Sequence, residues 1–311
     1  MSKILIALGG NALGNNAEEQ RRLAKNAAVA IADMIEQGHE VTVSHGNGPQ
    51  VGAINLAFKT YANSKGEDIL NMPFPESGAM SQGYIGYHLQ NAVRTELLNR
   101  GIKKNVVSLI TQVVVDKNDI AFKKPTKPIG PFYSKEEAEK LSHASGDHYI
   151  EDSGRGYRKV IPSPEPIQIL ESSIMKDLIE KEHIIIGAGG GGIPVIQEGN
   201  ELIGVEAVID KDKASEKLAE ELDVDFFFIL TAVEKVAIYF GKPNQKELKD
   251  MNVQEAINYI EQGHFPEGSM LPKVEAAIKF VKSKPGRRAI ISSLDKAKEA
   301  VLGKTGTVIY N

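Results

Sequence analysis

The chain has 311 residues, which is enough for one large α/β unit or for two lobes with a sizeable buried core. Its 37 basic and 41 acidic residues leave a net charge of −4, which argues against a nucleic-acid-binding surface. No apolar run approaches the ~18–20 residues of a membrane span, and the N-terminal segment is expected to be a strand, not a signal or transit peptide. The lack of cysteine excludes disulfides, thiol nucleophiles and cysteine-ligated metals, and it favours a reducing cytoplasm.

Short apolar runs alternate with longer amphipathic segments along most of the chain. Residues 3–8 (KILIAL) and 40–44 (EVTVS) are predicted strands, each followed by a predicted helix, and residues 106–115 (VVSLITQVVV) are predicted to form one buried strand. After residue 166 the alternation continues through ILESSIMKDLIEKE, HIIIGAG, DKASEKLAEEL, DFFFIL, VQEAINYIEQG, RAIISS and TGTVIY. This order predicts a mostly parallel sheet covered on both faces, with the active site beyond the carboxyl ends of the strands.

Residues 117–166 interrupt this alternation. The segment is rich in proline, lysine and turn residues, and Ser134 and Glu137 have the spacing of a capping box for one short helix. We interpret it as a small lid or protruding subdomain. The alternative is an unstructured insertion, against which aromatic residues such as Phe132 and Tyr149 count.

Three predicted strands run into glycine-rich turns. These turns are Gly9-Gly10-Asn11, His45-Gly46-Asn47-Gly48 and the run from Gly187 to Gly192. A glycine turn that opens onto a helix leaves backbone N–H groups free and adds the positive end of the helix dipole, which suits a phosphate. A single turn has a purely steric alternative, since a tight strand-to-helix junction also needs glycine. Three such turns at one sheet edge favour an anion site.

The best-known phosphate motifs do not explain these turns. The chain has no GxxxxGK[ST], and GAGGGG satisfies G-x-G-x-x-G only weakly, because Pro194 and Val195 follow it where an amphipathic helix is expected. Lysines from elsewhere in the chain must therefore meet the charge of any bound phosphate.

Three lysines are candidates for that role. Lys211 lies between Asp210 and Asp212 at a predicted helix start, Lys273 lies at another, and Lys127 lies between prolines in PTKPIG. The alternative for any lysine is a solvated surface position. A helix start disfavours a cation unless an anion shares the site, so Lys211 and Lys273 stand out. Backbone N–H groups and fixed cations are the parts that phosphoryl transfer needs.

Other polar residues are weaker candidates. His45 fits a structural histidine at a strand end better than a base or ligand, and no metal-ligand spacing includes His143 or His148. The acidic cluster of the 117–166 segment is interpreted as a solvated face; it comprises Asp147, Glu151 and Asp152.

The blocks that contain the candidate residues resemble the motif series of the carbamate kinases, within the wider amino-acid kinase family. They run in order from residue 3 to about 310: ALGGNAL, SHGNGPQVG, ESGAMSQGYIGY, KPIGPFY, GRGYRKVIPSPEP, GAGGGGIPV, GVEAVIDKD, FGKPNQ and GSMLPKVEAAI. The chain departs from the family pattern at Glu234, Ala237 and Lys159, where aspartate, an aromatic residue and arginine are more frequent. None of these departures removes a residue expected to touch the moving phosphoryl group.

The resemblance implies an α/β fold, a three-layer αβα sandwich with an open, mainly parallel central sheet and a small protruding lid subdomain at about 117–166. Residues 1–183 would form an N-terminal lobe on the carbamate, or phosphoryl-acceptor, side. Residues 184–311 would form a C-terminal, nucleotide-binding lobe.

The resemblance also implies roles for individual residues. Lys127 would reach from the lid toward the carbamate or its phosphate, Lys211 and Lys273 would neutralise the phosphoryl oxygens, and Asp212 would orient those lysines. The substrate and its phosphoryl group would contact Gly9, Gly10, Asn11, Gly46, Asn47 and Gly48. The nucleotide would contact Gly187, Gly189, Gly190, Gly191, Thr231 and Met270. No residue is expected to be a metal ligand.

The implied reaction is reversible phosphoryl transfer between ATP with carbamate and ADP with carbamoyl phosphate. The expected setting is the cytoplasm, with ATP made in arginine fermentation through the arginine deiminase pathway. Mg²⁺ would be carried mainly by the phosphates of ATP or ADP, because no carboxylate cage is evident. A homodimer formed through the sheet is expected, with no nucleic acid or membrane partner.

Three alternatives remain. A sibling kinase could act on an amino-acid carboxylate such as acetylglutamate, and assays with each acceptor would separate the two. A non-catalytic nucleotide-binding regulator is disfavoured by the intact Lys127, Lys211 and Lys273. A nicotinamide-dependent dehydrogenase is remote, and a titration with NAD would test it.

Overall fold

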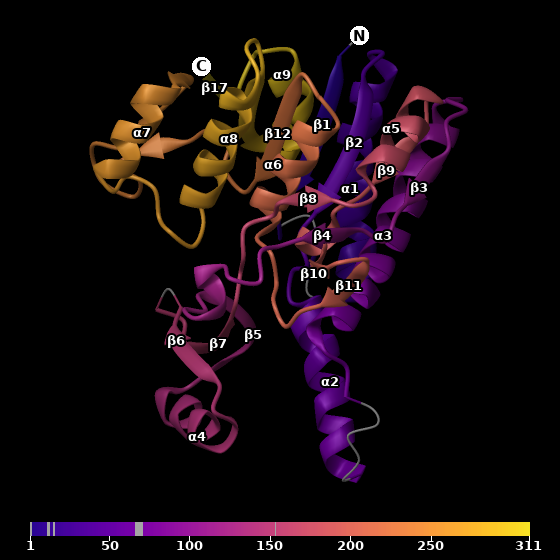
Figure 1. Cartoon of the computed structure of the whole chain (residues 1–311). Coiled ribbons are helices and arrows are strands. Elements are labelled where there is room, and N and C mark those ends of the chain that lie inside the picture. The colour runs from indigo at the N-terminus through magenta and orange to yellow at the C-terminus, as the bar shows by residue number, and fades with distance from the viewer. Residues whose placement is uncertain (1, 11–12, 15, 66–70, 153) are drawn as a thin grey trace.

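The centre of the molecule is an eight-stranded sheet with the order β15-β17-β16-β12-β1-β2-β9-β3 (Figure 1). The computed structural model describes residues 2–10, 13–14, 16–65, 71–152 and 154–311. In sheet order the strands are Asp250–Asn252, Thr307–Tyr310, Arg288–Ser293, Phe226–Thr231, Lys3–Leu8, Glu40–His45, Ile184–Ile186 and Val106–Ser108. Neighbouring strands pair in parallel except β16 and β17, which are antiparallel. The mainly parallel sheet predicted from the alternation is confirmed.

Helices cover both faces of this sheet (Figure 1). One face carries α1, α3 and α9, whose apolar side chains share a cluster with the strands, as Ile31 and Leu89 do with Val43. The other face carries α5, α6 and α8, which pack Met175, Leu218 and other residues around the same strands. The bounds of these helices are Ala17–Glu36, Phe74–Asn99, Ala297–Val301, Ser172–Glu180, Lys211–Glu221 and Leu271–Ser283. The predicted three-layer α/β sandwich is therefore confirmed.

Residues 106–115 form two strands, so the prediction of a single strand there is wrong. β3 ends at Ser108, and β4 (Gln112–Val114) joins a second sheet with the order β11-β10-β4-β8. Gln82 of α3 explains the break. Its amide accepts a hydrogen bond from the Thr111 N–H (2.8 Å) and donates one to the Thr111 carbonyl oxygen (3.1 Å). The Thr111 N–H is thus satisfied by a side chain, whereas the Thr111 carbonyl oxygen also accepts from the Ile193 N–H of β10 at 2.9 Å. The other strands of this sheet are Gln168–Ile169 (β8), Ile193–Glu198 (β10) and Glu201–Gly204 (β11).

The segment at 117–166 contains a small subdomain that protrudes from the body near α2 (Figure 1). It has a three-stranded sheet with the order β5-β7-β6 and one helix, α4. The predicted capping box is present at the start of α4, with Ser134 and Glu137 as its members. The bounds are Gln50–Lys65 (α2), Lys127–Tyr133 (β5), Lys135–Ser145 (α4), His148–Glu151 (β6) and Tyr157–Ile161 (β7). The protruding subdomain is thus present, and its movement as a lid stays a prediction.

The predicted boundary between two lobes falls inside the single central sheet. β9 opens the segment 184–311 in sequence, yet it lies between β2 and β3 of the N-terminal half. The division at 183 therefore stays a prediction, and the strand order groups β9 with the N-terminal half. The C-terminal half also contains Ala237–Ile238 (β13), Lys246–Glu247 (β14) and Val253–Glu261 (α7). None of the described helices has the length and apolar character needed to cross a membrane.

Candidate active site

Helix α6 begins at the acid-lysine-acid stretch from which a helix start was predicted. Asp210 is its N-cap, and the Asp210 Oδ1 atom accepts a hydrogen bond from the Asp212 backbone N–H at 2.8 Å. Aspartate is among the preferred N-cap residues because its carboxylate satisfies a free N–H of the first turn. The cap fixes Lys211 and Asp212 in that turn, where Lys211 Nζ donates to Asp212 Oδ1 at 2.6 Å.

Helix α8 brings a second lysine to the same carboxylate. The helix begins at Leu271 with Pro272 in its first turn, as the sequence predicted. Lys273 Nζ donates to Asp212 Oδ2 at 3.0 Å and to the Ser269 carbonyl oxygen at 3.1 Å. Asp212 is only 2% exposed, so one buried carboxylate holds two ammonium groups. This geometry fits the orienting role predicted for Asp212, which stays a prediction.

The third predicted lysine reaches the same group from the protruding subdomain. Lys127 is the first residue of β5, and its ammonium group forms an ion pair with Asp210 Oδ2. The side chains of Lys127, Lys211 and Lys273 are 31%, 16% and 12% exposed. The three lysines therefore form one partly buried group that is linked through two aspartates.

The charges of this group favour an anion. Three ammonium groups face two carboxylates, which leaves one positive charge in excess, and the N-terminal ends of α6 and α8 add to it. Burial lowers the pKa of Lys273, and repulsion from Lys211 lowers it further. Burial alone would raise the pKa of Asp210, but the Lys127 ammonium group, with Lys211 and the Asp212 N–H, holds it well below its usual range. An added anion would relieve the repulsion between the lysines.

The turn after β2 lies directly against Lys211. His45 pairs with Leu8 of β1, and the Gly46 N–H donates to the Leu8 carbonyl oxygen at 3.2 Å. A Cβ atom on Gly46 would lie 2.9 Å from Cδ of Lys211. Glycine at this position therefore leaves room for the stem of the lysine, and its predicted contact with substrate stays a prediction.

The turn after β1 lies beside the end of β12. The Gly9 N–H donates to the Leu230 carbonyl oxygen at 3.0 Å, and a Cβ atom on Gly9 would lie 2.8 Å from that oxygen. Gly10 has open space where its side chain would be. Asn11, the third residue predicted here, lies outside the described residues.

The glycine run after β9 is closed in by protein atoms. Its residues from Gly187 to Gly192 are all buried. A Cβ atom would overlap the His45 imidazole at Gly189, the Asn47 amide at Gly190 and the Ile209 carbonyl group at Gly191. The steric alternative weighed for a glycine turn therefore applies to these residues. Contact of Gly187, Gly189, Gly190 and Gly191 with a nucleotide stays a prediction.

Asn47 ties the second glycine turn to this run. Its Nδ2 atom donates to the Gly190 carbonyl oxygen at 3.0 Å, and its Oδ1 atom accepts from Ser81 Oγ at 2.8 Å. Gly48 has a φ of +53°, a backbone conformation that favours glycine. The amide of Asn47 is thereby fixed in orientation at the end of β2, where the predicted substrate contact stays untested.

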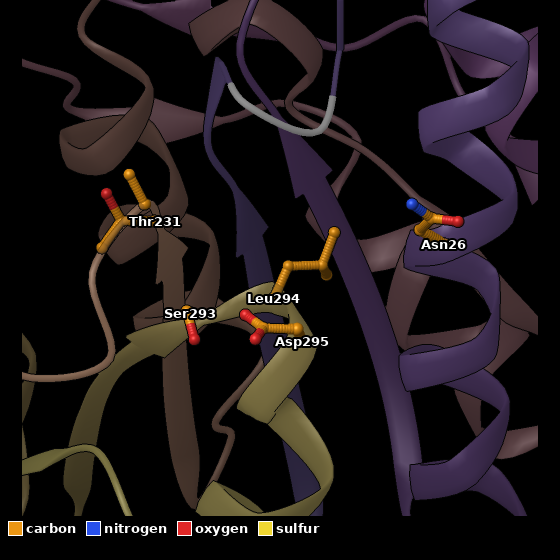
Figure 2. Close-up of a pocket in the computed structure, with 6 residues that line it drawn as sticks. Asn26, Thr231, Ser293, Leu294 and Asp295 are labelled. Atoms are coloured by element: carbon orange, nitrogen blue, oxygen red, sulfur yellow. The ribbon is translucent and has the colours of Figure 1, made fainter.

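The two residues that the resemblance predicts to contact the nucleoside lie at the end of β12 and just before the start of α8. Thr231 lines a cavity of about 310 Å³ together with Asn26, Ser293, Leu294 and Asp295, between α1 and the ends of β12 and β16 (Figure 2). Met270 immediately precedes α8 and packs against the core. Their contact with a nucleoside stays a prediction.

The weaker candidates have structural surroundings. His45 is buried, its Nδ1–H donates to the Gly46 carbonyl oxygen at 2.8 Å, and burial lowers its pKa to about 4. The acidic cluster is not simply a solvated face, because Asp147 pairs with Lys159 (2.7 Å) and Asp152 pairs with Arg158 (3.0 Å). These pairs join neighbouring parts of the protruding subdomain.

Sequence reasoning missed two polar residues that organise the site. Asp210 was noted only as a neighbour of Lys211, although it also binds Lys127. Gln82, which fixes Thr111 beside the glycine run, was not considered. The aspartate before a predicted helix was a visible N-cap signal, whereas nothing in the sequence pointed to the partner of Gln82.

Within the described ranges, no group of three or more His, Asp or Glu side chains is placed to hold a metal ion. The donors that surround the lysine group are two carboxylates already engaged with ammonium groups. The prediction that Mg²⁺ is carried by nucleotide phosphates stays a prediction.

Comparison with known proteins classifies the chain. The model of the amino acid kinase family matches residues 2–293. The chain belongs to the amino acid kinase family. This membership agrees with the αβα sandwich described above.

Curated relatives extend over the whole chain. Carbamate kinase-like protein YqeA of Escherichia coli is 55% identical over 99% of this chain and 98% of its own length. Carbamate kinase of Clostridium perfringens is 54% identical over 99% of both chains, and carbamate kinase 3 of Staphylococcus aureus is 50% identical over both full lengths. The resemblance to carbamate kinases seen in the motif blocks is confirmed.

Solved structures share the fold. Carbamate kinase from Giardia lamblia bound to AMP-PNP has a TM-score of 0.90 and 40% identity, covering 99% of this chain and 98% of its own. UMP kinase from Bacillus anthracis has a TM-score of 0.51 at 16% identity, with coverage of 99% and 96%, and shows the fold alone.

Proposed function

We propose that this chain catalyses reversible phosphoryl transfer between carbamoyl phosphate and ADP, with carbamate and ATP as products. The observation that carries the proposal is the sharing of Asp212 by Lys211 and Lys273 at the starts of two helices. Fixed cations at helix N-termini stabilise the charge of a transferring phosphoryl group. The likeness to curated carbamate kinases at 50% and 54% identity supports carbamate as the acceptor in the reverse direction.

The proposed reaction requires little covalent chemistry from the protein. In the direction of ATP formation, an oxygen of the terminal phosphate of ADP attacks the phosphorus of carbamoyl phosphate. The bond from phosphorus to the carbamate oxygen breaks, and its electron pair leaves with carbamate. The attacking and leaving oxygens are both anionic, so the step needs no general base to remove a proton. Lys211 and Lys273 neutralise the phosphoryl oxygens, and Lys127 faces the carbamate side.

The nucleotide is proposed to enter from the C-terminal half. Thr231 is the last residue of β12 and Met270 immediately precedes α8, so both lie in that half. The Giardia carbamate kinase bound to AMP-PNP supports a nucleotide site in this fold. Mg²⁺ supplies further neutralisation of phosphate charge when bound, and the carbamoyl and nucleotide phosphates are proposed to carry it.

The wider setting is also a proposal. We expect a cytoplasmic homodimer that makes ATP at the end of arginine fermentation. Strand β3 forms one edge of the central sheet, which is where a second subunit could continue it. Sedimentation of the purified chain would test the dimer, since a monomer at micromolar concentration would contradict it.

A coupled assay tests the reaction itself. ATP formation from ADP and carbamoyl phosphate is measured through hexokinase and glucose-6-phosphate dehydrogenase, with Mg²⁺ present and absent. Reverse assays supply ATP with either carbamate or N-acetylglutamate. Formation of ATP only with Mg²⁺, and preference for carbamate, are the expected results. Preference for N-acetylglutamate would overturn the assignment of the acceptor, and no transfer to any acceptor would overturn the proposal.

A further inference from the structure

Asp210 connects two parts of the molecule through its two carboxylate oxygens. Oδ1 accepts the Asp212 N–H at 2.8 Å and thereby caps α6, the helix that starts at Lys211. Oδ2 forms the ion pair with the ammonium group of Lys127 at the start of β5. The side chain of Asp210 is 16% exposed, so this pair is better shielded from solvent than an ordinary surface ion pair. One side chain thus holds the catalytic helix and the protruding subdomain together.

The ammonium group of Lys127 retains the capacity to bind substrate in this arrangement. A lysine ammonium group has three N–H donors. Among the described residues, the Lys127 ammonium group pairs with Asp210 alone. Two donors are therefore available to a substrate oxygen while the third keeps the direction of the side chain. Holding a flexible four-carbon stem in one direction lowers the entropy that substrate binding must overcome.

The backbone near Lys127 is supported on its other side as well. Gly52 of α2 lies so close to Gly130 that a Cβ atom on Gly52 would be 2.8 Å from the Gly130 nitrogen. Arg158 Nε donates to the Gly130 carbonyl oxygen at 3.0 Å, and Arg158 is itself paired with Asp152 at 3.0 Å. These contacts fix the middle of β5, but they leave the Lys127 side chain free to rotate. Asp210 supplies the contact at the ammonium end.

We propose that Asp210 is a positioning residue, which aims Lys127 at the acceptor end of the substrate while it caps the helix that carries Lys211 and Asp212. The inference rests on the proposed function and deepens it by placing a further residue behind the three lysines. Asp210 does not touch the reacting atoms. It acts through Lys127, so its loss affects the binding of carbamoyl phosphate more than the binding of ADP.

The substitution Asp210→Asn separates the two contacts. Asparagine caps a helix as well as aspartate does, so α6 keeps its N-cap, whereas the ion pair with Lys127 loses its charge. The KM for carbamoyl phosphate is expected to rise about tenfold, and the KM for ADP to stay within about twofold of the parent value. A parent KM for carbamoyl phosphate in Asp210→Asn would overturn the proposal.

Two further variants show whether Asp210 acts through Lys127. Glu165→Gln removes a neighbouring ion pair, to Lys213 of the same helix, and is expected to leave both KM values within about twofold of the parent. In a Lys127→Met background, adding Asp210→Asn is expected to change kcat/KM by no more than about twofold. Fully additive losses would overturn the proposal, because they would mean that Asp210 acts independently of Lys127.

A readout that needs no turnover keeps this test apart from the test of function. Amide hydrogen exchange is measured by mass spectrometry on the parent, Asp210→Asn and Glu165→Gln proteins without substrate. Exchange in residues 127–133 is expected to quicken about tenfold in Asp210→Asn alone, while α6 is unchanged. Parent exchange in residues 127–133 would overturn the anchoring role even if the enzyme proves active. Faster exchange there would support it even if carbamoyl phosphate proves to be the wrong substrate.

Discussion

The glycine run after β9 and the lysine group at the starts of α6 and α8 are both built from residue types that suit an anion, yet they are built in opposite ways. The run is buried and closed in by His45, Asn47 and the Ile209 carbonyl group. The lysine group is partly exposed and carries an excess of positive charge. Both drew attention in the sequence as places for phosphate.

The difference lies in what each residue type can indicate. A glycine indicates that something approaches the backbone closely, and here the approaching atoms belong to the protein itself. A lysine at a helix start is electrostatically unfavourable unless a negative group shares the site, so its placement carries information about charge. The lysine group is therefore expected to govern the chemistry, and the glycine run to govern stability.

The largest effect is expected from Lys211→Ala, which tests the first half of this contrast. Removing one preorganised cation should lower the rate of ATP formation from ADP and carbamoyl phosphate at least ~100-fold. Lys213→Ala is the matched control, because Lys213 lies two residues on in the same helix and pairs with the exposed Glu165. The coupled assay should find that control within about twofold of the parent. A Lys211→Ala enzyme with a near-parent rate would show that the group is structural and would remove the contrast.

The second half of the contrast is tested by Gly190→Ala. Gly190 has a φ of +66°, and an added Cβ atom would overlap the Asn47 amide, which is held by hydrogen bonds to Gly190 and Ser81. We expect the free energy of unfolding to fall by about 3 kcal/mol, from backbone strain and overpacking together. Denaturation by urea measures it.

The matched control for that variant is Gly199→Ala. Gly199 has a similar φ of +62°, but nothing lies within 4 Å of its added Cβ atom. Its expected cost is therefore the backbone strain alone, about 1 kcal/mol. Equal losses in the two variants would mean that the crowding around Gly190 contributes nothing, and the glycine run would need another explanation, such as a bound nucleotide.

The same contrast explains what could be predicted from the sequence. The alternation of apolar and amphipathic segments was sufficient for the parallel sheet, and the helix starts predicted at Lys211 and Lys273 are those of α6 and α8. These signals are local, because caps and periodicity depend on residues a few positions apart. The sharing of Asp212 by two lysines followed from the resemblance, since Lys273 is 61 residues away.

Local sequence patterns could not predict the contacts between segments that are far apart in the chain. The break at Thr111 depends on Gln82, which lies 29 residues earlier, and the apolar sequence around Thr111 gives no sign of it. The pairing of Lys127 with Asp210 spans 83 residues and joins the protruding subdomain to the start of α6. At Gly189 and Gly190, the space that glycine leaves is taken by the side chains of His45 and Asn47 in another turn, and no pattern within the run identifies them.

A smaller effect, dependent on pH, is expected from His45, which contacts the glycine run. Burial lowers its pKa to about 4 in the folded chain, against 6.5 for an unperturbed histidine. Between these values the unfolded chain binds the proton more strongly, so stability falls as the pH is lowered. The titration of His45 should lower the free energy of unfolding by about 2 kcal/mol as the pH falls from 6.5 to 4.5. Urea titrations of the parent and of His45→Gln across this range measure the difference in slope. Equal slopes would contradict a buried, neutral His45 and would leave room for a catalytic role.

The smallest effect is expected at a hydrogen bond that joins β2 to α6, the helix that begins with the lysine group. Ser44 of β2 and Ser215 of α6 join their hydroxyl groups at 2.6 Å, and both are buried. Ser44 lies two residues before Gly46, and Ser215 lies one turn after Lys211. Ser44→Ala should lower the free energy of unfolding by about 1 kcal/mol, because it leaves the Ser215 hydroxyl without this partner.

The double variant Ser44→Ala with Ser215→Ala sharpens this prediction. Once both hydroxyl groups are gone neither of them is left buried without its partner, so the double variant should lose less than the two single losses added together. Urea unfolding of the four proteins gives the coupling between the two residues. Strict additivity would mean that β2 and α6 are held only by packing, such as that of Gly46 on the Lys211 stem. A measurable coupling would mean that the hydrogen bond between Ser44 and Ser215 also holds together the strand that ends in the Gly46 turn and the helix that begins at Lys211.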